Sequence, residues 1–228
     1  MLDHTIFNER PESQDRAIKE LQAMGYQYIP RAEAEKKRGH LSRVLFPDVM
    51  HEFLSSQSFT YRGKVCPFPD DAIGEAIREL DAPLEKGLMY ASKAVYDRLV
   101  YGKSCEIHLY DGNAQSFDIS YVDWEHPEKN IWQVTEEFSV ERLNGKFARP
   151  DIVILVNGIP LAVIECKKAS VDVEEGVKQN VRNWQPDYIP QLFKFAQLVI
   201  AANPDTVKYG TAGTTQEYYC NWHEEDRE

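Results

Sequence analysis

Apolar residues in the first hundred positions recur mostly at helical spacing. One apolar stripe, followed by Gly25, predicts a helix over 11–24, and a second, followed by Gly102, predicts a longer helix over 84–100. The stretch Arg31–Arg38 is rich in charge and is expected to be a solvated helix or a linker. Residues 42–53 have a helical pattern interrupted by Pro47, and residues 66–70, with two prolines, are expected to form a loop.

From residue 106 onward the pattern changes to alternation and short β-branched runs, which indicate strands. Strands are expected at 106–110, 116–121, 132–140, 151–156, 161–166, 197–202 and 207–211, and helices at 173–184 and 192–196. Asn157-Gly158 lies between two apolar runs and predicts a hairpin. Helices, then a strand meander, then a helix and a strand favour an α/β (α+β) domain with a mixed central sheet flanked by helices.

The length of the chain, 228 residues, suffices for one globular unit with a sizeable core. Residues 1–100 are expected to form a mainly helical part packed on a core made by residues 101–228. No G-x-x-x-x-G-K-[ST] phosphate loop occurs, because the Gly/Thr-rich stretch 210–215 lacks the lysine. We therefore do not expect this chain alone to hydrolyse ATP.

Composition narrows the class of protein. Hydrophobic residues make up 43% of the chain, as in globular proteins, and no apolar run approaches the ~20 residues that a membrane span needs. The N-terminus has neither the basic nor the apolar segment of a signal peptide, so a cytoplasmic location is expected. The four cysteines form no C-x-x-C pair and are expected to be reduced thiols.

The net charge of −11 changes the expectation about partners. Phosphate neutralisation dominates DNA affinity, so an acidic chain is poorly suited to bind nucleic acid on its own. A metal-binding active site is itself acidic, however, and DNA can be delivered by basic surfaces of other domains or subunits. The charge predicts weak DNA affinity for the isolated chain and does not exclude a nuclease.

The chemically informative segment holds Pro150-Asp151, an apolar run, a turn, and Glu165-Cys166-Lys167. Hydrolysis of a phosphodiester needs charge neutralisation and an activated water, which a hard divalent cation held by oxygen ligands supplies. Carboxylates on neighbouring strands can hold such a cation, and a lysine two residues after the second carboxylate lies on the same strand face. There it can orient or help deprotonate the attacking water, or stabilise the developing charge.

This spacing makes a geometric demand on the hairpin. A plain two-residue turn at Asn157-Gly158 would place Asp151 opposite residue 164, so Asp151 and Glu165 would point to opposite faces of the sheet. An odd-length loop or one bulge restores a common face, and a type I turn with Gly158 at the left-handed bulge position suits the residues. We therefore predict a bulged or odd-length connection.

A D…E-x-K pattern alone is common in strand-rich proteins, where it marks solvated strand positions. Here the carboxylates stand at the ends of consecutive apolar runs and a helix follows directly, which favours a site. The run 147–168, FARPDIVILVNGIPLAVIECKK, resembles the PD-(D/E)XK nuclease motif. More narrowly, it resembles the N-terminal endonuclease domain of the restriction (R) subunit of type I restriction-modification enzymes. Residues 188–197 and 202–211 also match that family, whereas the first hundred residues match it only loosely.

The resemblance implies a restriction-endonuclease-like fold and cleavage of double-stranded DNA with Mg²⁺, or with Mn²⁺ in its place. It makes Asp151, Glu165 and the backbone carbonyl of Cys166 the metal ligands and Lys167 the catalytic lysine. R subunits of this family continue into an ATP-dependent helicase-like translocase, and methyltransferase and specificity subunits recognise the target. ATP and S-adenosylmethionine would then belong to the full complex. No motor motifs occur here, so the chain looks like a piece of such a subunit.

Two helical positions are candidates for auxiliary roles. The family often carries a glutamine-x-x-x-tyrosine element on the helix after the motif. Gln179 stands at the glutamine position and lies off the apolar stripe, whereas Asn183 replaces the tyrosine. Glu12 or Glu9 could add a carboxylate from the first helix, although acidic residues are common at helix N-termini.

The remaining candidates each have a structural alternative. Glu136 interrupts an apolar strand face, either as a further metal-site carboxylate or as a salt-bridged residue, and Lys168 could contact phosphate or simply be solvated. Trp184 and Tyr188 are expected in the core rather than as base-stacking platforms. Two rival functions are a repair or junction-resolving nuclease of the same fold, which would cut selectively on its own, and a non-catalytic docking module, which would bind no metal.

Overall fold

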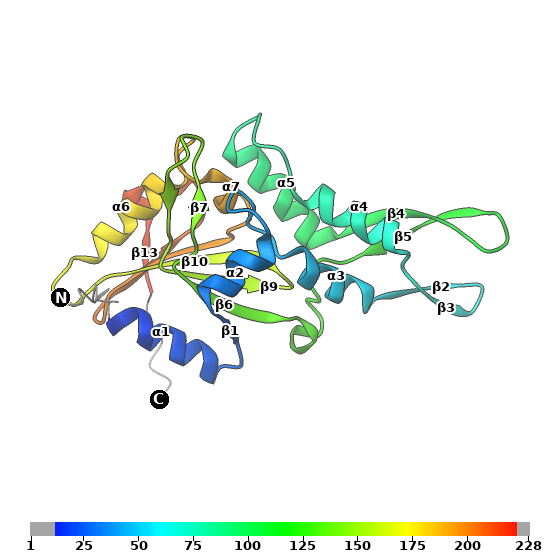
Figure 1. Cartoon of the computed structure of the whole chain (residues 1–228), viewed down its shortest axis with the longest axis horizontal. Helices are drawn as coiled ribbons and strands as arrows, with labels where there is room; N and C mark the ends of the chain where they lie inside the picture. Colours follow the sequence, from blue (N-terminus) through cyan, green and yellow to red (C-terminus); the bar gives the residue numbers. More distant parts are fainter. Residues whose placement is uncertain (1–11, 223–228) are drawn as a thin grey trace, which may run out of the picture.

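The computed structural model describes residues 12–222 of the chain. A mixed sheet of seven strands, in the order β1-β6-β9-β10-β11-β12-β13, forms its centre (Figure 1). The strands are β1 (Gln27–Ile29), β6 (Trp132–Glu136), β9 (Ile152–Val156), β10 (Ile159–Cys166), β11 (Leu198–Ala202), β12 (Val207–Gly210) and β13 (Cys220–Asn221). The pairs β1–β6 and β10–β11 are parallel, and the other neighbours are antiparallel.

Helices flank this sheet, with α1 on one side and α6 on the other (Figure 1). The described residues form α1 (Glu12–Ala23), α2 (Arg31–Arg38), α3 (Pro47–Ser55), α4 (Asp70–Leu80), α5 (Leu88–Tyr101), α6 (Val173–Asn183) and α7 (Pro190–Phe193), with 3₁₀ turns η1 (Pro127–Lys129) and η2 (Gln216–Tyr218). This arrangement confirms the predicted α/β restriction-endonuclease-like fold. None of the helices in the described part of the chain is long and apolar enough to span a bilayer.

Successive residues of β9 and β10 serve two separate cores, because strand side chains alternate between the faces of a sheet. On the α1 side, Ile152 and Ile164 pack with Ile18 of that helix. On the α6 side, Val153 and Val163 belong to a larger cluster that continues through α3, α4 and α5. The central hairpin is therefore covered on both faces, which explains its nearly continuous apolar sequence.

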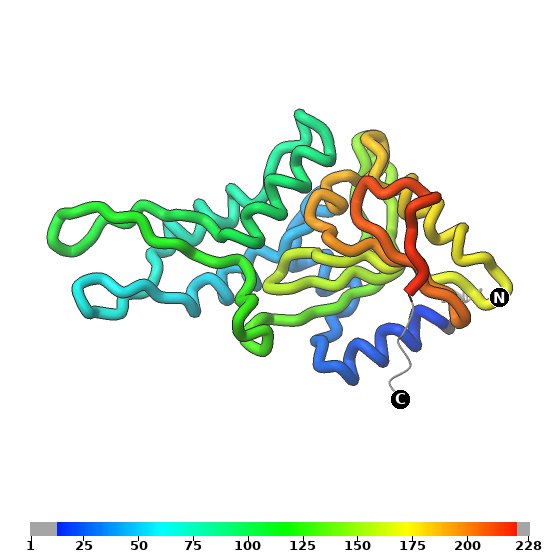
Figure 2. The backbone as a smooth tube through the Cα atoms, turned by 180° about the vertical axis from the view of Figure 1, so that it is seen from behind, coloured from blue at the N-terminus to red at the C-terminus, as the bar shows by residue number. Residues whose placement is uncertain are grey.

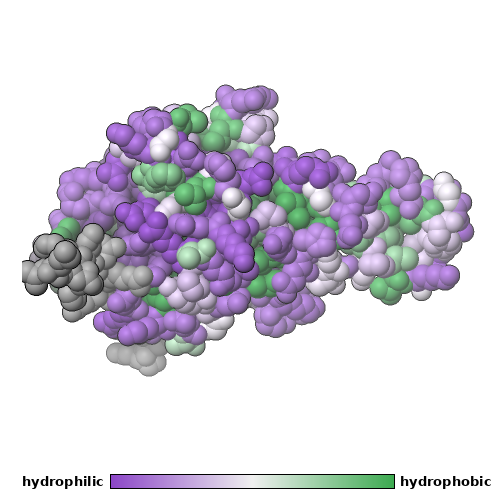
Figure 3. Space-filling model, viewed as in Figure 1, coloured by the Kyte–Doolittle hydropathy of each residue, from purple (hydrophilic) through white to green (hydrophobic). Residues whose placement is uncertain are grey.

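Two hairpins project together from this body as an arm (Figures 1 and 2). They are β2 (Ser58–Tyr61) with β3 (Lys64–Pro67), and β4 (Lys103–His108) with β5 (Ala114–Ile119). The rings of Phe59 and Phe117 stack at 4.1 Å between centroids, and the hydroxyl of Tyr61 donates to Asp111 at 2.9 Å. These contacts join the two hairpins. Apolar side chains lie exposed on the arm in an otherwise mainly hydrophilic view (Figure 3).

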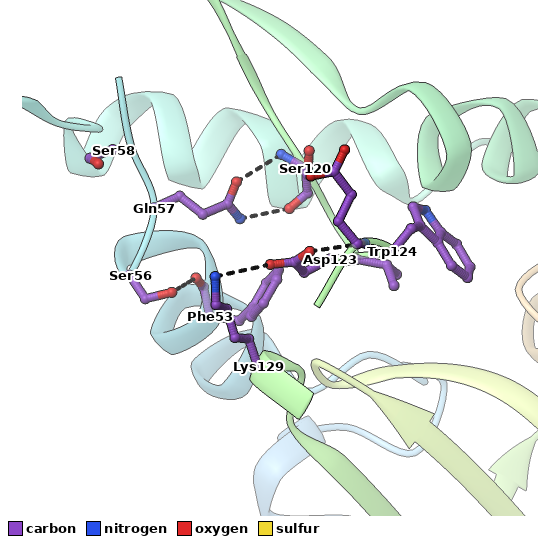
Figure 4. Close-up of a pocket in the computed structure, with 10 residues that line it drawn as sticks. Phe53, Ser56, Gln57, Ser58, Ser120, Asp123, Trp124 and Lys129 are labelled. Carbon is purple, nitrogen blue, oxygen red and sulfur yellow. Dashed lines mark hydrogen bonds and ion pairs between the residues drawn. The ribbon is translucent and has the colours of Figure 1, made fainter. Parts of the chain in front are cut away.

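A polar hollow of about 590 Å³ lies at the base of the arm (Figure 4). Gln57 faces Ser120 across it and forms two hydrogen bonds with that residue's backbone, at 2.7 and 2.9 Å. Asp123 accepts from the backbone of His126 and lies 4.0 Å from the amine of Lys129. These hydrogen bonds and the ion pair link the segments that line the hollow.

The structure corrects several local predictions. Residues 66–70 are not a loop, because β3 runs to Pro67 and α4 begins at Asp70. The charged stretch Arg31–Arg38 is a helix, but it is not simply solvated, since Ala34 and Arg38 are buried. The helix expected from residue 84 begins at Leu88, after Gly87. A small hairpin, β7 (Val140–Glu141) with β8 (Phe147–Ala148), precedes the motif and was not anticipated.

Candidate active site

The register of the β9–β10 hairpin decides which residues can form a site. Val156 pairs with Ile159, so the turn itself has two residues, Asn157 and Gly158. Their φ angles are +53° and +79°, as a type I′ turn requires. The register then shifts by one residue between Pro160 and Ala162, and Ile152 pairs with Ile164.

The predicted bulge is therefore confirmed, but its position and the predicted turn type are wrong. The turn is not a type I turn with Gly158 as the bulge residue; the extra residue is Leu161, inside β10. One step beyond the Ile152–Ile164 pair, Asp151 stands next to Glu165. Both carboxylates consequently lie on the α6 face of the sheet.

Tertiary contacts explain why the tight turn is kept. The side chain of Asn157 is buried and bonds distant backbone, accepting from Ile131 at 2.7 Å and donating to Tyr121 at 3.0 Å. At Gly158 a Cβ atom would lie 2.7 Å from the carbonyl oxygen of Phe46. The turn is thus held in the body of the protein, and the bulge has to occur further along β10.

Asp151 lies at the start of β9 and is mostly buried. Its Oδ2 accepts a hydrogen bond from the backbone amide of Cys166 at 2.8 Å, which ties it to the neighbouring strand end. Burial raises the pKa of its carboxyl, and the amide of Cys166 and the charge of Lys167 offset part of that effect.

Glu165 is fully buried, with 0% of its surface exposed. Its Oε1 accepts a long hydrogen bond of 3.4 Å from the amide of Asn183, and its Oε2 has no hydrogen-bond partner among the described residues. Burial and then the like charge of Asp151 raise the pKa of Glu165 well above its ordinary value, and Lys167 opposes them. A carboxylate this buried and this poorly paired is costly unless a cation accompanies it.

Lys167 projects from the end of β10 on the same face as Glu165, as the alternation of strand side chains predicts. Its amine lies 3.9 Å from Oε2 of Glu165 and donates to Oε1 of Gln179 at 2.7 Å. Gln179 belongs to α6, which buries Val173 and Val177 against the sheet and turns Gln179 towards the strand end. The helix after the motif therefore holds the lysine.

Close packing of α6 brings these groups together. At Gly176, a Cβ atom would lie 3.0 Å from the Cβ of Ala201 and 3.5 Å from Cγ of Lys167. A side chain larger than that of glycine would crowd Ala201 of β11 at this position. One and two turns further along, Gln179 and Asn183 contact Lys167 and Glu165, respectively.

The start of α1 also meets the site. Ser13 donates to the carbonyl of Lys167, and the buried Gln14 donates to the carbonyl of Asp151, both at 3.0 Å. Glu12 is the first residue of this helix, but its side chain, like all of Glu9, lies outside the described residues. Their proposed carboxylate role stays a prediction.

Glu136 and Trp184 do not join the site, and the proposed phosphate contact of Lys168 stays a prediction. Glu136 pairs with Ile152, so it faces the α1 side, where it accepts from the hydroxyl of Tyr28 at 2.7 Å. Lys168 is exposed just beyond Lys167. Trp184 is buried against Phe193, as expected of a core residue.

Two cationic residues next to the site were not singled out from the sequence. Lys178 and Arg182 line a groove along α6 with Lys167, and the charge of Arg182 reaches Glu165. The sequence could have indicated them, because residues three and four apart on a helix share a face and Arg182 lies three residues after Gln179 and four after Lys178. Ser13 and Gln14 carried no such signal, since their contacts depend on tertiary packing.

The donor set suits a hard divalent cation. Two carboxylates meet at the strand ends, and one of them has a buried oxygen without a hydrogen-bond partner in the described part of the chain. Within residues 12–222, no group of three or more His, Cys, Asp or Glu side chains is arranged to hold a metal ion. A cation here would rely on two side chains, with backbone and water oxygens as further ligands, which is usual for Mg²⁺.

Comparison with known proteins identifies the family of the chain. The chain matches the family model for the type I restriction enzyme R protein N terminus over residues 6–218. The putative type I restriction enzyme MjaIXP endonuclease subunit of Methanocaldococcus jannaschii is 30% identical over 132 residues, which are 57% of this chain and 13% of the relative. The HindI endonuclease subunit of Haemophilus influenzae is 24% identical over 214 residues, which are 90% of this chain and 19% of the relative. The EcoprrI endonuclease subunit of Escherichia coli is 27% identical over 218 residues, which are 92% of this chain and 62% of the relative.

Proposed function

Because the chain belongs to the family of type I restriction enzyme R protein N termini, as its match over residues 6–218 shows, we propose that it is the DNA-cleaving part of such an enzyme. It would hydrolyse phosphodiester bonds of double-stranded DNA and serve defence against foreign DNA. The observation that carries the proposal is the bulge at Leu161, since it puts Asp151 and Glu165 on one face beside Lys167.

In this proposal Asp151, Glu165 and the carbonyl of Cys166 hold Mg²⁺, or Mn²⁺ in its place. A bound cation supplies charge neutralisation at the phosphoryl oxygens and lowers the pKa of a bound water. Lys167 orients the attacking water or stabilises the charge that develops on the phosphoryl group. Gln179 fixes the direction of the lysine amine, and Asn183 fixes the Glu165 carboxylate.

The relatives suggest a larger context. The chain spans 13%, 19% and 62% of the three relatives named above, all of which carry the name of endonuclease subunits. We infer that it works with translocase domains that consume ATP and with methyltransferase and specificity subunits that use S-adenosylmethionine. The net charge of −11 is consistent with DNA being delivered by those partners.

Metal titration combined with plasmid cleavage tests the proposal. Mg²⁺ or Mn²⁺ should bind the wild-type chain and not the Asp151→Ala variant, as followed by isothermal titration calorimetry. Glu136→Gln is the matched control, because it alters a buried carboxylate of the neighbouring strand on the opposite face. Nicking of supercoiled plasmid should be lost in Lys167→Ala.

Equal metal binding by wild type and Asp151→Ala would overturn the catalytic proposal and favour a docking module. Structure-selective cutting by the isolated chain would favour a repair or junction-resolving nuclease instead. In a full-length R subunit, Lys167→Ala should abolish restriction in cells while ATP hydrolysis is retained.

A further inference from the structure

A groove of about 450 Å³ runs along α6 and opens directly beside Lys167. The residues that line it are Lys167, Val171, Glu175, Lys178, Gln179 and Arg182. Three of these side chains are cationic and one is acidic, in a chain whose net charge is −11. The lining of this groove is therefore net positive, whereas the chain as a whole is net negative.

The two cations on α6 are available to a ligand. Lys178 forms an ion pair of 2.7 Å with Glu175, but both side chains are more than half exposed, and such surface pairs contribute little. The side chain of Arg182 forms no hydrogen bond or ion pair within residues 12–222, and its guanidinium lies 5.3 Å from the ring centre of Tyr188. Arg182 lowers the pKa of the buried Glu165 through its charge but forms no ion pair with it, and Lys178 pairs with the exposed Glu175.

Some other cations of the described residues have acidic partners. Arg62, on the arm, also stands 5.3 Å from a tyrosine ring, but it forms an ion pair with Asp111 at 3.1 Å. Lys103 contacts two glutamates, at 2.8 and 3.1 Å. Arg182 differs from Arg62 because it has no anionic partner within residues 12–222.

We propose that this groove binds the sugar-phosphate backbone of duplex DNA, with Lys178 and Arg182 contacting phosphates next to the one that is cut. This rests on the proposed nuclease function, which places the scissile phosphate near Lys167. Residues 178 and 182 lie about one helical turn apart, roughly 5–6 Å along the axis, so they can contact the same phosphate or two neighbouring ones. Such contacts position the strand and carry no sequence information.

The test measures binding of a short DNA duplex by fluorescence anisotropy, with Ca²⁺ replacing Mg²⁺ to prevent cleavage, over a range of KCl concentrations. The groove variant is Lys178→Ala combined with Arg182→Gln. The matched control is Lys93→Ala combined with Arg62→Gln, because Lys93 forms a similar helix-surface pair with Asp97 at 2.8 Å. The slope of log affinity against log salt should fall by about two in the groove variant and stay unchanged in the control.

A second readout does not depend on mutation. Acetylation of lysine amines, followed by mass spectrometry, should slow several-fold at Lys178 when duplex is added, while Lys93 reacts at an unchanged rate. An unchanged salt slope in the groove variant, unprotected Lys178, or no duplex binding by wild type at the lowest salt would overturn the proposal.

Cleavage with Mg²⁺ separates this inference from the proposed function. If Lys167→Ala abolishes cutting and the groove variant binds and cuts like wild type, the nuclease function stands and the groove assignment fails. If wild type binds duplex through the groove but never cuts, the groove assignment stands and the nuclease function fails.

Discussion

Arg38 and Glu165 are two fully buried ionisable residues that differ in how many hydrogen bonds they form. Arg38 is 1% exposed, and its guanidinium lies 3.9 Å from the ring centre of Phe138. It donates to three carbonyl oxygens, those of Ala34, Arg43 and Ser139. Burial lowers the pKa of Arg38 to about 10, so it stays charged at neutral pH. Glu165 is equally buried but has one long hydrogen bond and a carboxylate as neighbour.

The difference separates a structural charge from a functional one. Three carbonyl oxygens and the ring of Phe138 compensate most of the Arg38 guanidinium, although its Nη2 has no hydrogen-bond partner within residues 12–222, so its burial serves the packing of α2 against the body. Glu165 remains undercompensated in the chain itself, and such residues persist where function requires them. The four predictions below test this contrast.

The largest effect on stability is expected at Arg38. Arg38→Ala should lower the free energy of unfolding by about 3–5 kcal/mol, because it leaves buried carbonyl groups unpaired and opens a cavity beside Phe138. The melting temperature should fall by roughly 6–20 °C. Lys37→Ala, on the same helix but in a partly exposed pair with Glu33, should change stability by less than about 0.5 kcal/mol.

Asn183 should matter for metal binding, because its amide is the hydrogen-bond donor to Glu165. Asn183→Ala should weaken Mg²⁺ affinity by roughly 10–100-fold, as is typical when a residue supporting a metal ligand is removed. Asn180→Ala is the control, since that buried amide donates instead to the carbonyl of Ile200 at 2.9 Å. Equal losses of affinity in the two variants, measured by calorimetry, would show that Asn183 acts only through packing.

Replacing Glu165 should stabilise the metal-free protein. Glu165→Gln removes a charge that burial and Asp151 disfavour, and we expect a gain of about 1–2 kcal/mol at neutral pH, together with loss of metal binding. The pKa of Glu165 is raised in the folded chain, so the contribution of this group to stability is fully present at low pH and is lost as pH rises through that pKa. The advantage of the variant should grow from acidic to neutral pH in urea titrations; a constant difference would refute this account.

The smallest change in stability is expected at Gly176. Gly176→Ala gains about 1 kcal/mol of helix propensity but crowds Ala201 at 3.0 Å, so the net change should stay within about 1 kcal/mol. Cleavage should nevertheless decrease, because a displacement of α6 by the added methyl group would move Gln179 and Asn183 away from Lys167 and Glu165 at the strand ends. Cleavage at the wild-type rate would show that the contact between α6 and the sheet tolerates a methyl group.

The sequence was most informative where local pattern and chemistry coincide. The apolar runs of β9 and β10, the helix after them and the need for a shared face were sufficient to predict the hairpin, α6 and a bulge. The bulge could not be placed at Leu161, because Asn157 is held by bonds to Ile131 and Tyr121, which are distant in sequence.

The sequence did not predict two short strands whose stability comes from pairing with residues that are distant along the chain. β1 and β13 have only three and two residues, and their pairing with β6 and β12 has no local signature. α4 did leave a signal, because Ile73, Ala76 and Leu80 recur at helical spacing after Pro69. This helical pattern was not predicted as a helix, because residues 66–70, which directly precede it, were expected to form a loop.

The extra residue at Leu161 has a genetic consequence. Deleting that single codon would leave every letter of the D…E-x-K pattern intact and would also keep the cross-strand pairs, because a regular two-residue hairpin would then place Asp151 opposite Glu165 on the α6 side. Such an allele would encode a hairpin that brings the two carboxylates together without a bulge. The interval in residue numbers between the two carboxylates therefore decides whether the hairpin needs a bulge, and an even interval such as that between Asp151 and Glu165 requires one.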